Sequence, residues 1–240
     1  MKKIIRLIIR LSLFIFSYFI YLINLIFICL KFKNISKYFF IYASLICSRS
    51  LGLTYKLNNE FKIKLLEKGI HISNHDHPLD IFVAQSIFRL PTITTVDQHL
   101  KKILPFFEIC LRNFGHFQFN HLDHKDRKSA YLFLKKICNN KKSVLIYPSG
   151  SIYTGIDKRF SRSISKLSIN NGLKVIAWQL DYKDISKKYY FYKKDVLKFI
   201  LTRFISEEIE LYVKKVKIFI PKDYSCEQEY HDMLLSFYKD

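Results

Sequence analysis

An uncharged apolar run near the N-terminus constrains the fold more than any other feature of the sequence. Residues 11–30 (LSLFIFSYFIYLINLIFICL) contain no formally charged side chain, and about 20 apolar residues make a helix long enough to cross the hydrocarbon layer of a membrane. A secretory signal peptide is the rival interpretation. Its apolar region is shorter, about 7–15 residues, and ends at a small-residue cleavage site that this run lacks. We therefore expect a retained N-terminal transmembrane helix.

The flanks of this run leave its orientation in the membrane open. Basic residues lie on both sides, so the positive-inside rule barely discriminates between the two orientations. A second apolar stretch, residues 38–47, is too short to span a membrane. It either lies in the membrane interface or packs as a core helix against the remaining chain. The basic residues before and after the run are Lys2, Lys3, Arg6, Arg10, Lys31, Lys33 and Lys37.

The rest of the chain is long enough for one substantial domain. With 240 residues, no internal repeat and no linker-like segment, we expect a membrane anchor and interfacial segment in residues 1–50 and a single domain in residues 51–240. The formal net charge of +20 would attract either nucleic acid or an anionic membrane. Because no helix-turn-helix, RNP or zinc-finger pattern is present, we expect no nucleic-acid partner.

A histidine and an aspartate follow a short buried strand. Residues 53–57 alternate as a strand does, and residues 69–72 form a second strand that ends at Ser73. Residues 79–88 continue as a helix, which places Asp80 in its first turn and His75 in the loop before it. A loop residue can fold back onto the helix, so the carboxylate can hold the imidazole in the tautomer that a general base requires.

This pattern resembles the lysophosphatidate (1-acylglycerol-3-phosphate) acyltransferase family. Asn74, His75 and Asp80 match its first motif, Asn-His-x-x-x-x-Asp, and residues 101–115 resemble the segment that leads into its second. Its third motif, Phe-Pro-Glu-Gly-Thr-Arg, corresponds to residues 147–152. The likeness covers residues 70–180, where residues 160–172 resemble the family's next helix and residues 173–178 its hydrophobic strand. It implies an α/β fold with a central mixed sheet flanked by helices, beside the N-terminal transmembrane helix.

The resemblance also implies which residues form the site. His75 and Asp80 would be catalytic. Substrate would be bound by Asn74, Tyr147, Pro148, Ser149, Gly150, Ser151, Arg159 and Arg162. Three positions depart from the family: His121 replaces an arginine, and Ser149 and Ile152 replace the glutamate and arginine of the third motif. Arginine suits phosphate because its planar group donates two hydrogen bonds, so Lys158, Arg159 and Arg162 either supply the charge or form a membrane-facing rim.

The expected activity is acyl transfer from acyl-CoA or acyl carrier protein to a lysophosphatidate-like lysolipid in a membrane. No cofactor beyond the thioester co-substrate is implied. The histidines show no metal-site spacing, so no metal is expected. Five widely spaced cysteines favour a reducing compartment, and we expect the catalytic domain on the cytoplasmic side. Two alternatives stay open: an acyltransferase with a different lysolipid acceptor, and a degenerate homologue that keeps the fold without activity.

Overall fold

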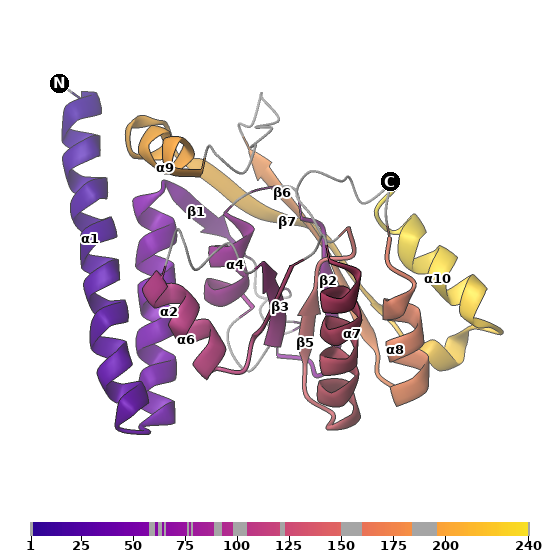
Figure 1. The fold of residues 1–240 in the computed structure, drawn as a ribbon. Helices are drawn as coiled ribbons and strands as arrows, with labels where there is room; N and C mark the ends of the chain where they lie inside the picture. Colours follow the sequence, from indigo (N-terminus) through magenta and orange to yellow (C-terminus); the bar gives the residue numbers. More distant parts are fainter. Residues whose placement is uncertain are drawn as a thin grey trace.

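The computed structural model of the chain describes residues 2–57, 61, 64, 66–75, 77, 79–88, 93–97, 105–120, 123–149, 160–183 and 196–239. Within these residues, helices and strands alternate along most of the chain (Figure 1). The helices are α1 (Lys2–Cys29), α2 (Lys33–Ser50), α4 (Asp80–Ser86), α6 (Pro105–Asn113), α7 (His124–Asn139), α8 (Ser163–Asn171), α9 (Val196–Ile205) and α10 (Glu227–Ser236), with a short 3₁₀ helix η1 (Pro221–Asp223).

The described strands form one mixed sheet. They are β1 (Leu53–Lys56), β2 (Ile70–Ser73), β3 (Ile93–Asp97), β4 (Phe117–Phe119), β5 (Val144–Ile146), β6 (Val175–Lys183) and β7 (Ile209–Phe219), in the spatial order β1-β7-β6-β2-β5-β3-β4. All neighbouring pairs are parallel except β6 and β7, which are antiparallel. Helices connect most of the parallel strands, as crossovers between parallel strands require. The expected α/β class with a mixed sheet is confirmed.

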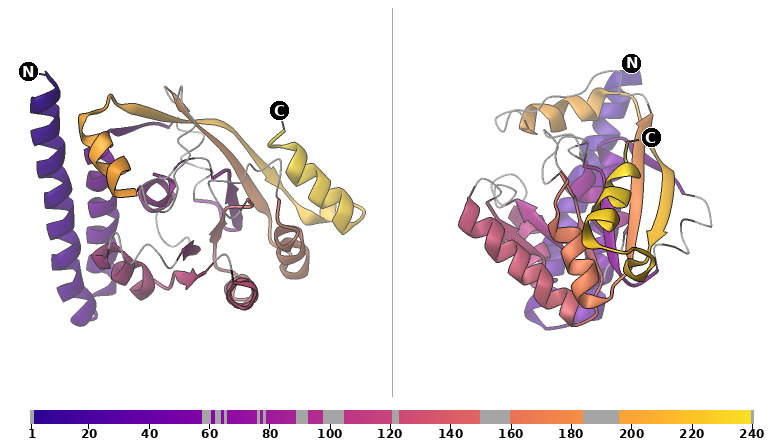
Figure 2. Two further views of the ribbon diagram at one scale, coloured as in Figure 1. Left: turned by 45° about the horizontal axis from the view of Figure 1, so that its top comes forward. Right: turned by 90° about the vertical axis from the view of Figure 1, so that its right-hand side faces the viewer.

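Helices cover both faces of the sheet. One face packs against α1, α2, α4, α6 and α9, and the other against α7, α8 and α10 (Figures 1 and 2). The buried strand β2 shows why: Ile70 and Ile72 face the second group of helices, while His71 points to the other side. Residues on a strand alternate between the two faces, so both faces of a central strand can be buried.

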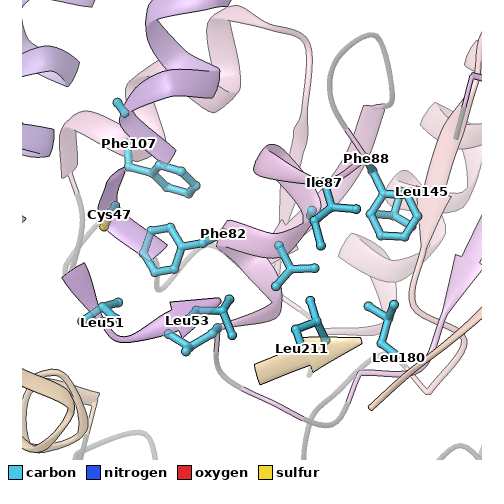
Figure 3. Close-up of a cluster of buried hydrophobic side chains, with 14 of the residues drawn as sticks. Cys47, Leu51, Leu53, Phe82, Ile87, Phe88, Phe107, Leu145, Leu180 and Leu211 are labelled. Atoms are coloured by element: carbon cyan, nitrogen blue, oxygen red, sulfur yellow. The ribbon is translucent and has the colours of Figure 1, made fainter. Parts of the chain in front are cut away.

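The larger core joins the N-terminal helices to the sheet. In Figure 3, Phe107 of α6 and Phe82 of α4 lie next to Cys47 of α2, and Leu53 and Leu211 approach from the strands β1 and β7. All of these side chains are almost fully buried. The helices α1 and α2 therefore share a hydrophobic core with the rest of the chain. The division into residues 1–50 and 51–240 stays a prediction.

The helix α1 is largely apolar on its outside, and most of its fully buried residues are polar. Its buried residues are Arg10, Ser17, Tyr21 and Asn24. Arg10 Nη1 donates to the carbonyl oxygens of Arg203 (2.8 Å) and Ser206 (2.6 Å) at the end of α9. Farther along, Asn24 Nδ2 donates to Cys110 Sγ of α6 (3.4 Å). At a rise of 1.5 Å per residue, these contacts hold α1 against the molecule over about 21 Å.

Most element predictions agree with the structure, with shifted ends. The apolar run 11–30 lies in α1 except for its last residue; α1 starts earlier and is the one described helix long and apolar enough to cross a membrane. The stretch 38–47 belongs to α2, which packs against α1 and carries buried residues of the larger core. The helix expected at 79–88 ends at Ser86, and the strand expected at 173–178 continues as β6 to Lys183.

Candidate active site

The predicted catalytic pair lies at the carboxyl end of β2. His75 follows this strand, and Asp80 begins α4. His75 Nδ1 lies 2.7 Å from Asp80 Oδ2. A carboxylate accepts hydrogen bonds, so Nδ1 carries the hydrogen and Nε2 keeps its lone pair. The His75 side chain is 24% exposed, whereas that of Asp80 is 1% exposed. The imidazole is therefore held from the buried side and accessible from the other.

Asn74 fixes the loop that carries His75. Its Nδ2 donates to the Leu180 carbonyl oxygen (2.8 Å), and its Oδ1 accepts from the Leu180 backbone nitrogen (2.7 Å). The side-chain amide thus continues the pairing of β2 with β6 by one more residue. Because these bonds use both ends of the amide, they give Asn74 a structural role. A role in binding substrate stays a prediction.

Two further donors reach the Asp80 carboxylate. The backbone nitrogen of His77 donates to Oδ2 (3.1 Å), and the hydroxyl of Tyr182 on β6 donates to Oδ1. The rings of His77 and Tyr182 stack with centroids 4.6 Å apart. The carboxylate is therefore held by contacts to the loop before α4 and to the central sheet.

Tyr147, which follows β5, lies against the catalytic histidine. Its ring stacks on that of His75, with centroids 4.4 Å apart and planes inclined by 27°. Its hydroxyl donates to the backbone carbonyl oxygen of Asp80 (3.1 Å). The Tyr147 ring therefore supports the His75 ring from one side, and its role in binding substrate stays a prediction.

Burial sets the protonation states around the pair. Desolvation lowers the pKa of His77 to about 4, and its Nδ1 accepts from the Leu79 backbone nitrogen (3.1 Å). Burial, with the charge of Asp80 as a further cause, raises the pKa of the Tyr147 and Tyr182 hydroxyls well above 10. Near neutral pH, His77 is thus uncharged and both tyrosines remain hydrogen-bond donors.

The other predicted substrate residues lie near this loop or outside the described residues. Pro148 and Ser149 are buried directly after Tyr147. Arg162 is exposed and precedes α8. Burial, and after it the charge of Arg162, lowers the pKa of His231 of α10. Gly150, Ser151 and Arg159 lie outside the described residues, as do Lys158, His121 and Ile152. Their roles in binding substrate stay predictions.

The structure adds one residue that the motifs did not indicate. Tyr182 lies beyond the last residue of the resemblance, and neither its spacing nor its neighbours form a pattern that points to a site. Only the alternation of buried and exposed residues along β6 would have placed it on the same face as Trp178 and Leu180. Among the described residues, no group of three or more His, Cys, Asp or Glu is arranged to hold a metal ion.

Comparison with known proteins places the chain in a family. A family model described as Acyltransferase matches residues 55–192, which is more than half of the 240 residues and includes the His75–Asp80 pair. The crystal structure of the 1-acyl-sn-glycerophosphate (LPA) acyltransferase, PlsC, from Thermotoga maritima is similar, with a TM-score of 0.62 and 16% identity. That similarity covers 100% of this chain and 96% of the other. No curated protein sequence matches. The chain therefore belongs to the acyltransferase family and is an acyl-transferring enzyme.

Proposed function

We propose that the enzyme transfers a fatty acyl group from a thioester to the free hydroxyl of a lysophosphatidate-like lysolipid, with His75 as general base. The observation that carries this proposal is the 2.7 Å contact between His75 Nδ1 and Asp80 Oδ2. It leaves Nε2 of a partly exposed ring free to accept a proton. Asp80 orients this ring and stabilises the imidazolium that forms.

The reaction needs one base and no further redox or metal chemistry. The lysolipid oxygen attacks the thioester carbon while its proton moves to His75 Nε2. The new carbon–oxygen ester bond forms, the carbon–sulfur bond breaks, and the sulfur leaves as a thiolate that takes the proton back from the imidazolium. Acyl-CoA and acyl carrier protein both carry the acyl group as the thioester that this reaction needs. We propose no cofactor besides the thioester.

The proposed acceptor rests on the family and on the fold. The similar crystal structure is that of an LPA acyltransferase, and the first motif of that family is present as Asn74, His75 and Asp80. The acceptor phosphate would be met by positive charge next to the third motif, where Arg162 is exposed. If these positive side chains do not bind the acceptor phosphate, we expect the enzyme to use a different lysolipid acceptor.

We propose that α1 holds the enzyme on the membrane through its outer face. After Lys2 and Lys3, the exposed side chains of α1 are almost all apolar, whereas Arg10, Ser17 and Asn24 are buried against the molecule. A helix of this kind is stable only if lipid or protein covers its apolar face. Because α1 contacts α9 and α6 over about 21 Å, a perpendicular crossing would bring both helices into the hydrocarbon layer. We therefore propose that α1 does not cross the membrane as expected from the sequence. The outer face of α1 and α2 is instead buried in the lipid surface, with the catalytic domain on the cytoplasmic side.

Activity measurements with matched variants test the base and the acceptor. The full chain, purified in lipid–detergent micelles, is given acyl-CoA or acyl carrier protein thioester and a panel of lysolipids. We expect ester formation on lysophosphatidate, and a decrease of kcat of about 10²–10⁴-fold in His75→Ala. His124→Ala is the control, because His124 is exposed at the start of α7. Full activity of His75→Ala would exclude His75 as the base, and transfer only to other lysolipids would exclude the proposed acceptor.

A further inference from the structure

The Asp80 carboxylate is held on both oxygens by residues from two parts of the chain. Oδ2 accepts from His75 Nδ1 and from the His77 backbone, whereas Oδ1 accepts from the Tyr182 hydroxyl. We propose that Tyr182 is a positioning residue for acyl transfer: its hydroxyl fixes the Asp80 carboxylate in the rotation that directs Oδ2 at His75. This inference rests on the proposed role of His75 and Asp80.

Tyr182 is itself rigidly placed. It lies on β6 two residues after Leu180, whose backbone is bonded twice to Asn74. The pairing of β6 with β7 shifts register between Gln179 and Leu180, so β7 contributes an extra residue there. The bulge brings Val213 and Leu211 opposite Leu180 and Tyr182, on the same buried face. Bulges beside active sites often serve to aim a side chain in this way.

The stacked ring of His77 restrains Tyr182 from the other side. The two ring centroids are 4.6 Å apart, and the His77 backbone nitrogen also donates to Asp80 Oδ2. The tyrosine ring is therefore enclosed by the sheet and by the loop that it helps to position. A hydroxyl on so restrained a ring has few alternative directions in which to donate.

The hydroxyl matters because water cannot easily replace it. Asp80 and Tyr182 are both buried, and a buried carboxylate oxygen that loses a donor must either stay unsatisfied or turn toward another donor. Turning the carboxylate would displace Oδ2 from His75. Burial and the charge of Asp80 raise the pKa of Tyr182 well above 10, so the hydroxyl keeps its proton at the pH at which acyl transfer is measured.

Tyr182→Phe removes the hydroxyl and leaves the ring in place. We expect kcat to fall about 10–100-fold, as the loss of a hydrogen bond to a charged group implies, while KM for lysolipid and thioester stays within about twofold. Tyr230→Phe is the matched control. Tyr230 is also buried and its hydroxyl is hydrogen-bonded to Ser168, but it lies in the core on the opposite face of the sheet. Thermal unfolding of both variants shows whether either loses stability.

A double-mutant cycle separates this inference from the assignment of the base. If Tyr182 acts through Asp80 on His75, Tyr182→Phe should not lower the residual rate further in a His75→Ala background. An equal loss in both backgrounds would overturn the inference, as would a Tyr182→Phe enzyme whose kcat matches that of Tyr230→Phe. If His75→Ala alone retained full activity, the proposed base would be wrong, and that result does not depend on Tyr182.

Discussion

At the scale of single residues, contacts distinguish two histidines that are two positions apart in the sequence. His75 is partly exposed and bonded to Asp80, whereas His77 is buried, accepts from the Leu79 backbone and stacks on Tyr182. The position of His75 in the motif predicts that it is the base. Its contact with Asp80 through Nδ1 and the partial exposure of its ring fit that role. His77 is part of the packing under the pair, so its replacement by alanine should also disturb Asp80.

Tyr147 offers a test of how the imidazole is supported. Its ring stacks on His75, and its hydroxyl donates to the Asp80 carbonyl oxygen. We expect Tyr147→Phe to keep kcat within about tenfold of the parent, because the ring contact survives and one neutral hydrogen bond is lost. Tyr147→Leu should reduce kcat further, because the stacking surface is lost. Steady-state rates of the two variants, measured side by side, check this order, and equal rates would contradict it.

At the scale of elements, Arg10 shows what fastens α1 to the enzyme. Its guanidinium bonds to two carbonyl oxygens at the end of α9 and lies against Gly52, where a Cβ would come within 2.6 Å of Arg10 Nη2. Arg10→Leu leaves these carbonyls without their charged donor. We expect the free energy of unfolding to fall by about 1.5–3 kcal/mol, measured by thermal unfolding in detergent micelles.

The control for Arg10 comes from the same helix. Arg6 is only partly buried, and its Nη1 lies 3.5 Å from the Ile205 carbonyl oxygen, at the limit of a hydrogen bond. Arg6→Leu should therefore change the midpoint of unfolding much less than Arg10→Leu. Equal shifts would mean that the two arginines act only through the total charge of the N-terminal segment.

Much of the element order could be predicted from the sequence, but less of how the elements meet. The strand before His75 and the helix beginning near Asp80 follow from local apolar patterns and from Pro78. The sequence also indicates which face of α1 packs inward. Arg10, Ser17, Tyr21 and Asn24 are spaced by seven, four and three residues, which puts them on one helical face. Arg10 belongs both to this face and to the basic residues that flank the apolar run. The contact of Tyr182 with Asp80 joins residues 102 positions apart, and no local pattern encodes it.

At the scale of the whole molecule, three buried histidines predict how stability depends on pH. Burial lowers the pKa of His71, His77 and His116 from 6.5 to about 4. Each accepts a hydrogen bond at Nδ1, from Trp178, Leu79 and Thr94 respectively. As the pH falls from about 6.5 to about 4, the unfolded chain therefore takes up protons that the folded chain excludes. The stability that these three histidines contribute is fully present above pH 6.5 and is lost as the pH falls toward 4.

Thermal unfolding at a series of pH values checks this dependence. The midpoint should fall between pH 6.5 and pH 4 in the parent, and should fall less steeply in His116→Asn, which removes one of the three titrating groups and keeps an acceptor for the Thr94 backbone. A slope in His116→Asn equal to that of the parent would show that His116 is already protonated in the folded state, or that other groups dominate the acid response.

The last prediction concerns the apolar outer face of α1, which is exposed in the isolated molecule and which lipid would cover in a membrane. Its exposed side chains include Ile15 (60% exposed) and Phe19 (56% exposed). If this face lies in lipid, the enzyme stays in the membrane fraction after alkaline carbonate and after high salt, because salt screens charges and does not weaken hydrophobic burial. Ile15→Asp combined with Phe19→Asp should release it, since both substitutions replace an apolar side chain that the lipid would bury with a charged one.

The control is Leu132→Asp, which puts one such charge on a similarly exposed apolar residue of α7 (53% exposed), on the opposite side of the sheet. Its membrane fraction should equal that of the parent. Release by Leu132→Asp alone would place α7 on the membrane instead. A parent enzyme that high salt removes would show that the positive charge, and not α1, holds it there. Because α1 packs on both α6 and α9 through its inner face, the released Ile15→Asp, Phe19→Asp enzyme should still transfer acyl groups to lysolipid in detergent micelles. The outer face of α1 would then determine where the enzyme is located, and the inner face would stabilise the fold.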